Sequence, residues 1–245
     1  MIEEKLKGKT VAIVGLGRSW FEYCLAKSHG HNFDEVWAIN AVSNVIYHDR
    51  VFMMDPASRF LDTDDAGGQT SGMTEVLLNH KGPIYTCELD DRCPGLVDYP
   101  IKEVVSTTNC HYLNNTTAYA VAFALYQQVG TLKLFGVDFS YKENIHFAES
   151  GRACTEFWCA TAVSKGIKVE VANRSGLLDT NVPDSEKLYG YHRLDDPLFQ
   201  QFNEQGLLIT KQSEVAPPEP IDNKPILFGR HDIQKLNGVD NHVSN

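Results

Sequence analysis

Short apolar segments alternate with helix-like segments along most of this chain, and this alternation restricts the fold more than any other feature. TVAIVG at residues 10–15, EVWAIN at 35–40 and DRVFMMD at 49–55 are typical of strands buried on both faces of a parallel sheet. TLKLFGVD and IKVEVA follow later, each after a helix-like segment. Strands that alternate with helices imply parallel pairing with right-handed crossovers. We therefore predict an α/β fold, a Rossmann-like parallel sheet flanked by helices.

Several local predictions accompany this fold. Ser19 stands three residues before Glu22, a spacing that predicts a mutual capping pair and a helix running to about residue 28. A long helix follows the sequence NNTT, with Gly130 as its C-terminal cap, and another helix is predicted at 151–164. Between the first helix and the long helix, IKEVVS at residues 101–106 resembles a strand, and residues 56–72 read as a long polar loop over the carboxyl ends of the strands.

Composition narrows the class of protein. With 42% hydrophobic and 22% charged residues, and no apolar run near the roughly 20 residues that span a bilayer, we expect a soluble protein without a membrane span. The first ten residues lack a signal-peptide core, so we expect it to be cytoplasmic. A net charge of -10 argues against general nucleic-acid binding. The six cysteines show no metal-binding spacing, so we expect reduced thiols.

The chain of 245 residues suits one α/β domain with an appendage. From about residue 205 the sequence becomes rich in proline, asparagine and charge. We therefore predict a nucleotide-binding domain over residues 1–204 and a polar C-terminal arm or tail over 205–245. The sequence leaves open whether the chain forms a homo-oligomer.

The turn GLGRSW after the first strand is the first candidate for ligand binding. Gly15 and Gly17 permit a tight turn with backbone close to a ligand, but Trp20 stands where a dinucleotide fingerprint has its third glycine. Asn40, and not an acidic residue, ends the second strand, which also disfavours an NAD site. Arg18 is a candidate phosphate ligand. We expect a turn for a single nucleotide, with Trp20 packed beneath it.

Four further positions lie at strand ends or helix starts. Thr116 and Thr117 begin the long helix, where free amides and the dipole favour an anion, although they also suit ordinary caps. Asp55 and Asp138 end two strands, and such a pair could hold Mg²⁺ with a triphosphate, bind ribose hydroxyls or cap turns. His146 follows the Asp138 strand and is a candidate general base.

The order of these segments resembles a known family. VAIVGLGRSW, AIN, FMMDP, NNTTAYAVAFALYQQVGTLKLFGVDFSY, a histidine and KGIKVEVANRSGLL follow one another as in bacterial lipo-oligosaccharide sialyltransferases that use CMP-sialic acid. They equally resemble the 6-hydroxymethylpterin pyrophosphokinase-like family, many of whose members are described as glycosyltransferases or occur in bacteriophages. The likeness covers residues 9–178.

The sialyltransferase resemblance implies a role for each matching residue. His146 matches the catalytic base in the order of segments, across a shorter loop, and Tyr141 is the nearest counterpart of a tyrosine that assists the leaving phosphate. The resemblance also implies a nucleotide site. Leu16 and Arg18 stand where the turn of the family carries asparagine and proline, and Asp55-Pro56 stands where the family has N-P. The matching nucleotide-binding positions are Gly15, Gly17, Ser19, Asn40, Thr116, Thr117, Gly136 and Asp138.

Three functional hypotheses follow. The first is a nucleotide-dependent transferase, a glycosyltransferase with a nucleotide-sugar donor, which works by direct displacement and implies no metal or other cofactor. The second, suggested by the pyrophosphokinase-like resemblance, is a Mg²⁺-dependent pyrophosphoryl or nucleotidyl transferase that depends on Asp55 and Asp138. The third is a non-catalytic nucleotide-binding module of a phage, which would act in the host cytoplasm through the tail after residue 205.

Overall fold

The computed structural model describes residues 6–64, 67–141, 144–188, 190, 198–204, 206–211 and 214. It divides the chain into two compact units, Met1–Lys187 and Leu188–Asn245.

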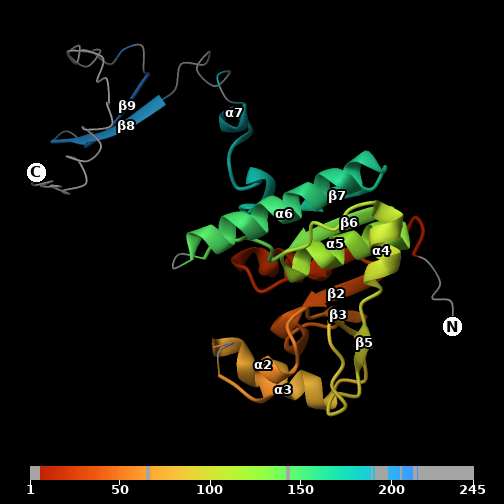
Figure 1. The fold of residues 1–245 in the computed structure, drawn as a ribbon. Helices are drawn as coiled ribbons and strands as arrows, with labels where there is room; N and C mark the ends of the chain where they lie inside the picture. The colour runs from red at the N-terminus through yellow and green to blue at the C-terminus, as the bar shows by residue number, and fades with distance from the viewer. Residues whose placement is uncertain are drawn as a thin grey trace, which may run out of the picture. The chain divides into compact units, whose positions relative to one another are not determined.

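The first unit is built on a seven-stranded parallel sheet, which confirms the predicted Rossmann-like α/β fold (Figure 1). The order across the sheet is β5-β4-β3-β2-β1-β6-β7, and every neighbouring pair is parallel. The strands are β1 (Thr10–Val14), β2 (Glu35–Ile39), β3 (Arg50–Phe52), β4 (Ile84–Thr86), β5 (Leu96–Asp98), β6 (Thr131–Phe135) and β7 (Lys168–Val171).

Helices cover both faces of this sheet, because each strand buries alternate side chains on opposite faces. Val11 and Ile13 of β1 belong to one core cluster, together with residues of α4, α5 and α6. Ala12 and Val14 belong to the other, together with residues of α1, α2 and α3. The helices are α1 (Phe21–Ser28), α2 (Ser58–Leu61), α3 (Thr70–Asn79), α4 (Ile101–Thr108), α5 (Thr116–Gln127), α6 (Ile145–Ser164) and α7 (Asp184–Lys187), with short 3-10 turns η1 (Arg18–Trp20), η2 (Asn40–Asn44), η3 (Gly67–Gln69) and η4 (Leu177–Asp179).

The prediction of a strand in IKEVVS was wrong, since this segment is the start of helix α4. Val104 is buried and Val105 and Thr108 are half-buried, which is the spacing of one helix face. The strand that precedes this helix in the chain is β5. The strand prediction failed because the segment has only six residues, too few to distinguish the periodicity of a helix from that of a strand.

Two helix ends also differ from the predictions. Helix α6 begins at Ile145 and not at residue 151, because the Asn144 side chain accepts a hydrogen bond from the Phe147 amide and caps it (3.2 Å). Helix α5 ends with Gln128 in the left-handed conformation (φ 60°), so Gly130 is not its cap. The predicted loop at 56–72 contains α2, η3 and the first turns of α3.

The second unit contains an antiparallel hairpin of β8 (Leu198–Asn203) and β9 (Gly206–Lys211). The predicted boundary at residue 205 falls between these two strands in the chain, and most of the predicted tail lies outside the described residues. Among the helices that the structure describes, none combines the length and apolar character needed to cross a bilayer. All six cysteines fall within the described residues, and none of them forms a disulfide there.

Candidate functional site

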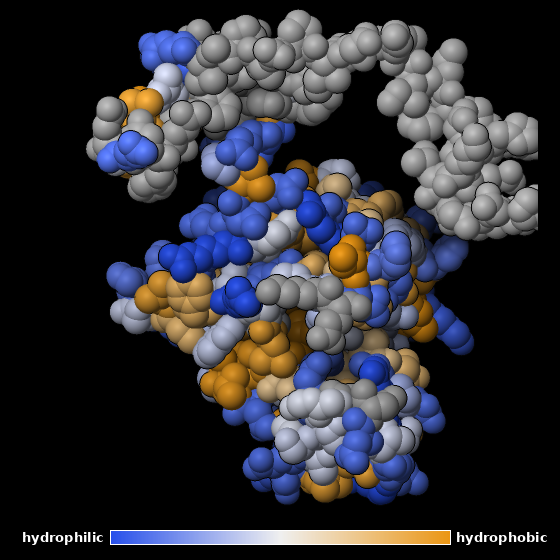
Figure 2. All heavy atoms as spheres, turned by 90° about the vertical axis from the view of Figure 1, so that its left-hand side faces the viewer, coloured by the Kyte–Doolittle hydropathy of each residue, from blue (hydrophilic) through white to orange (hydrophobic). Residues whose placement is uncertain are grey.

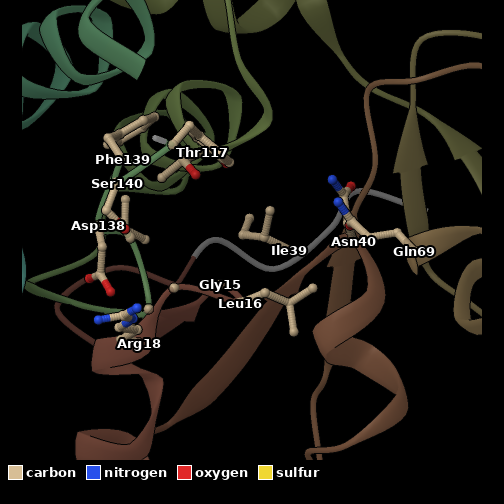
Figure 3. A pocket seen from close by; sticks show the side chains of 14 residues that line it. Gly15, Leu16, Arg18, Ile39, Asn40, Gln69, Thr117, Asp138, Phe139 and Ser140 are labelled. Atoms are coloured by element: carbon tan, nitrogen blue, oxygen red, sulfur yellow. The ribbon is translucent and has the colours of Figure 1, made fainter. Parts of the chain in front are cut away.

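The sheet has one topological switch point, between β1 and β6. From β1 the chain proceeds outward to β5 and then returns to place β6 on the other side of β1. Ligands of open α/β sheets bind in the crevice that such a reversal opens beyond the carboxyl ends of the strands. A pocket of about 300 Å³ lies here, called the switch-point pocket below (Figure 3). It is lined by Gly15, Leu16, Gly17, Arg18, Ile39, Asn40, Gln69, Thr117, Gly136, Val137, Asp138, Phe139, Ser140 and Tyr141.

The turn after β1 is bonded firmly to the turn after β6. The Gly17 amide donates to the Gly136 carbonyl (2.8 Å), and the Gly136 amide donates to Ser19 Oγ (2.9 Å). Ser19 in turn donates from its amide to Asp138 Oδ2 (2.8 Å) and from its hydroxyl to Asp138 Oδ1. Ser19 is completely buried and Asp138 is 9% exposed. These bonds fix the floor of the pocket and engage both carboxylate oxygens of Asp138.

This arrangement overturns the predicted capping pair of Ser19 and Glu22. Ser19 bonds to Asp138 instead, and Glu22 accepts from the amides of Asn173 and Arg174, each at 2.9 Å. Both donors of Ser19 thereby reach a carboxylate, and the Glu22 carboxylate accepts from two amides where the local cap would supply one. Trp20 is half-buried and packs against the core under the turn, as predicted.

Glycine is required at two positions of this floor. A Cβ atom on Gly17 would lie 2.7 Å from Asp138 Oδ2 and 2.7 Å from the Gly136 carbonyl oxygen. Gly136 has φ +66°, and a Cβ there would lie 2.9 Å from the Cβ of Trp20. Any side chain would therefore separate the two turns, so the glycines act by allowing close contact of backbone with backbone.

Several polar groups around the pocket have no partner among the described residues. The amides of Gly15, Gly17 and Ser19 bond toward β6, whereas the intervening amides of Leu16 and Arg18 form no such bond. The Thr117 hydroxyl and the Arg18 guanidinium are likewise without a described partner. Groups of this kind cost free energy unless water or a ligand satisfies them.

Asn40 supplies a stronger sign of a ligand. Its Oδ1 atom is buried and has no hydrogen-bond partner among the described residues. The residue follows β2 in the left-handed conformation (φ 51°), which costs free energy for a residue with a side chain. Figure 3 shows Asn40 and Gln69 on the side of the pocket opposite Arg18 and Asp138. A ligand donor group at Asn40 would compensate for this buried acceptor.

Helix α5 presents its N-terminus to the same pocket. Asn115 caps it by accepting a hydrogen bond from the Ala118 amide (3.0 Å). Thr117 lines the pocket, but Thr116 does not. The first-turn amides and the helix dipole favour an anionic ligand group beside Thr117.

A second pocket of about 650 Å³ adjoins the first and is called the α6 pocket below. Ile145, Ala148, Glu149 and Arg152 of α6 line it, at the spacing of a single helix face. His146 lies one position outside this face, is exposed, and lines neither pocket. The two pockets share Arg18, Asp138, Phe139, Ser140 and Tyr141, and the α6 pocket also includes Arg174, Gly176 and Asn181.

Sequence reasoning missed Glu149, Arg152 and Arg174 as residues of this site. The available signal was the i, i+3, i+4, i+7 spacing of the pocket-lining residues from Ile145 to Arg152. The predicted helix began at residue 151, so it excluded most of these positions and the spacing was not recognised. Of these residues, Arg152 donates to Glu156 (2.8 Å) and Asp179 (2.7 Å). The hydrogen bond to Glu156 is the main cause that raises the pKa of the Arg152 guanidinium.

Asp55 and Asp138 are not brought together. Strands β3 and β6 are three positions apart in the sheet, roughly 14 Å at the usual strand spacing. Asp55 pairs with Arg59 and does not line the switch-point pocket. Among the described residues, no three histidine, cysteine or acidic side chains cluster as metal ligands. The Mg²⁺ hypothesis remains a prediction that no described contact between these carboxylates supports.

No family model matches this chain, and no curated protein sequence matches it. Among solved structures, the chain is similar to the sialyltransferase CstII from Campylobacter jejuni in complex with the substrate analogue CMP-3FNeuAc. The sequences are 17% identical, the match covers 69% of this chain and 82% of that chain, and the TM-score is 0.45. A likeness of this degree carries no argument about function. The phage origin stays a prediction.

Proposed function

We propose that this protein is a nucleotide-dependent transferase whose donor is a nucleotide sugar. The observation that carries the proposal is the switch-point pocket, in which unpartnered amides, a hydroxyl, a guanidinium and a buried amide oxygen converge. Its volume of about 300 Å³ is within the range of small-molecule sites. The ordered motifs that resemble sialyltransferases favour a nucleotide sugar as the donor.

The unpartnered groups suggest how the donor lies. Its phosphate would accept from the amides of Leu16 and Arg18, from the Arg18 guanidinium and from the start of α5 at Thr117. The nucleoside would extend toward Asn40, where a ribose hydroxyl or a base amino group could donate to the buried Oδ1 atom. The turn that would bind the donor is fixed by the hydrogen bonds among Ser19, Gly136 and Asp138, so these residues would contribute to donor binding indirectly.

The reaction would be a direct displacement at the anomeric carbon of the donor. A base removes the proton of an acceptor hydroxyl as its oxygen bonds to that carbon, and the bond from the carbon to the phosphate oxygen breaks. The charge that develops on the leaving phosphate would be stabilised by the turn amides, Arg18 and Tyr141. Glu149 is our candidate for the base, since it lies on the face of α6 that lines the adjoining pocket. His146 is the competing candidate from the sequence.

Calorimetric titration tests the donor site. CMP, UMP, GDP and ATP and the sugar conjugates of these nucleotides are titrated into the protein, with Mg²⁺ or with EDTA. We expect one nucleotide to bind in EDTA and Thr117→Val to weaken its binding about tenfold, because that change removes one hydrogen-bonding hydroxyl. The matched control is Thr161→Val, whose exposed hydroxyl donates to the Phe157 carbonyl within α6 and lines neither pocket.

Two results would contradict the proposal. One is the absence of binding by every nucleotide and conjugate in both conditions. The other is equal affinity in the Thr117→Val and Thr161→Val variants, which would place the ligand elsewhere. Binding that requires Mg²⁺ would instead favour the pyrophosphoryl or nucleotidyl transferase hypothesis.

A further inference from the structure

We propose that the α6 pocket is the acceptor subsite and that it takes an acceptor carrying a carboxylate or a phosphate. The inference rests on the proposed function, because it assigns the switch-point pocket to the donor. The shared lining of Arg18, Asp138, Phe139, Ser140 and Tyr141 is then the place where the two substrates meet.

The charges of the α6 pocket are the first reason. Three arginines line it, in a chain whose net charge is -10. Arg152 is neutralised by Glu156 and Asp179, but Arg18 and Arg174 have no acidic partner among the described residues. The lining also holds the carboxylates of Glu149 and Asp138, but both oxygens of Asp138 accept hydrogen bonds from Ser19. The two guanidinium groups of Arg18 and Arg174 therefore outnumber the one carboxylate of the lining that has no described partner, which favours an anionic ligand.

The second reason is that Arg174 is held in place before any ligand binds. Its amide donates to Glu22 (2.9 Å), and its guanidinium carbon lies 5.1 Å from the centre of the Phe21 ring. The next residue, Ser175, donates from its hydroxyl to the Val137 carbonyl (2.6 Å) and so joins this loop to the turn after β6. A positioned guanidinium loses little conformational entropy when it binds an anion.

The third reason is the division of roles between the two free arginines. Arg18 lines both pockets and can bind the donor phosphate, whereas Arg174 lines only the α6 pocket. Arg174 is therefore free to select the acceptor. Glu149 lines the same pocket from the facing helix and can receive the proton of the acceptor hydroxyl, while Asn181 and Ser140 offer polar contacts for further hydroxyls.

The test compares three ligands of one sugar that differ in charge. Galactose, galacturonate and galactose 6-phosphate are titrated by NMR into the full chain, with and without CMP. We expect at least one of the two anions to bind at least tenfold more tightly than galactose, and the tighter one identifies a carboxylate or a phosphate as the preferred group. Because Arg174 is exposed, added NaCl should reduce this preference.

Arg174→Gln should remove most of the preference for the anion and leave the affinity for galactose and for CMP unchanged. Arg174→Lys keeps the positive charge and should restore part of the preference. The matched control is Arg92→Gln, since Arg92 is also exposed but pairs with Asp62 and Asp90 and lines neither pocket. Thermal melting of each variant checks that the fold is retained.

Failure of this inference and failure of the proposed function give different results. Equal affinity for galactose and both anions, or an anion preference that survives Arg174→Gln, would overturn the anionic subsite while nucleotide binding stands. Loss of all nucleotide binding would overturn the donor site, whereas an Arg174-dependent preference for the anion would still support an anion site in the α6 pocket.

Discussion

The two edges of the sheet carry the same kinds of polar residue and use them differently. At the amino edge they bond to one another and to the ends of the strands: Asp34 accepts from the Thr10 amide, Asp49 accepts from the Val36 amide, and Arg50 binds Glu35. At the carboxyl edge, Arg18, Asn40, Thr117 and Glu149 present groups without described partners. Satisfied polar groups thus hold strands in place, and the unsatisfied ones lie on the side where we propose that the ligand binds.

The largest effect should be a loss of folding stability, caused by a substitution at the amino edge. Arg50 is 8% exposed and donates to Glu35 (2.6 and 3.0 Å) and to the Tyr85 hydroxyl (2.8 Å). We expect Arg50→Met to lower the free energy of unfolding by about 3–5 kcal/mol, because Glu35 would keep a half-buried charge without its main partner. Urea denaturation measures this loss, and nucleotide affinity of the folded variant should not change.

Arg92→Met is the control for this prediction. Arg92 makes a comparable set of bonds to Asp62 and Asp90, but it is exposed, so its loss should cost less than about 1 kcal/mol. Equal losses in the two variants, or a large change in nucleotide affinity for Arg50→Met, would break the distinction between the two edges.

The next largest effect should be a loss of turnover, caused by a substitution at the carboxyl edge. We expect Glu149→Gln to slow release of the nucleotide from the bound nucleotide sugar about a hundredfold, because the variant cannot accept the proton, with unfolding free energy nearly unchanged. His146→Gln is the paired variant, on the same exposed first turns of α6 but outside the face that lines the pocket. The opposite order of rates would restore His146 as the base.

Much of the fold and of the switch-point pocket could be predicted, because both depend on local patterns. The apolar segments predict β1, β2, β3, β6 and β7, and Gly15, Gly17 and Asn40 follow directly from the ends of the first two of these strands. The partners of Ser19 and Glu22 could not be predicted, since they lie 119 and 151 residues away in the chain. Arg174 was missed for the same reason, because only tertiary structure brings it to the pocket, whereas Glu149 was missed because the predicted start of α6 excluded it.

Asp138 differs from the other polar residues of the carboxyl edge, because both of its carboxylate oxygens accept hydrogen bonds from Ser19. We expect Asp138→Asn to lower the free energy of unfolding by about 2 kcal/mol, because one of the two Ser19 donors would face an amide nitrogen. Asp55→Asn, at the end of another strand, loses only a half-exposed pair with Arg59 and should cost less than about 1 kcal/mol. Urea denaturation measures the loss of unfolding free energy in both variants. Equal losses would show that Asp138 does not hold the turn in place.

The smallest effect concerns two histidines at the amino edge, where even a titratable pair is used for structure. The Gly82 amide donates to His80 Nδ1 (2.9 Å), so a neutral His80 carries its proton on Nε2 and donates it to His48 Nε2 (2.9 Å). His48 then donates from Nδ1 to the Ile46 carbonyl (2.9 Å). Protonation of His80 would place its Nδ1–H group against the N–H group of Gly82, so the folded protein favours neutral His80.

Burial, and then the neighbouring His48, lower the pKa of His80 below its ordinary value of 6.5. The unfolded chain therefore binds this proton more readily, and the stabilisation, complete above about pH 6.5, is lost as the pH falls toward the lower folded pKa. The slope cannot exceed about 1.4 kcal/mol per pH unit for one proton. Urea denaturation between roughly pH 7.5 and 5.5 should show this decline in the wild type and a flatter profile in His80→Asn. Parallel profiles would show that the pair does not couple folding to protonation, and the amino edge would then owe its stability to its carboxylates and Arg50 alone.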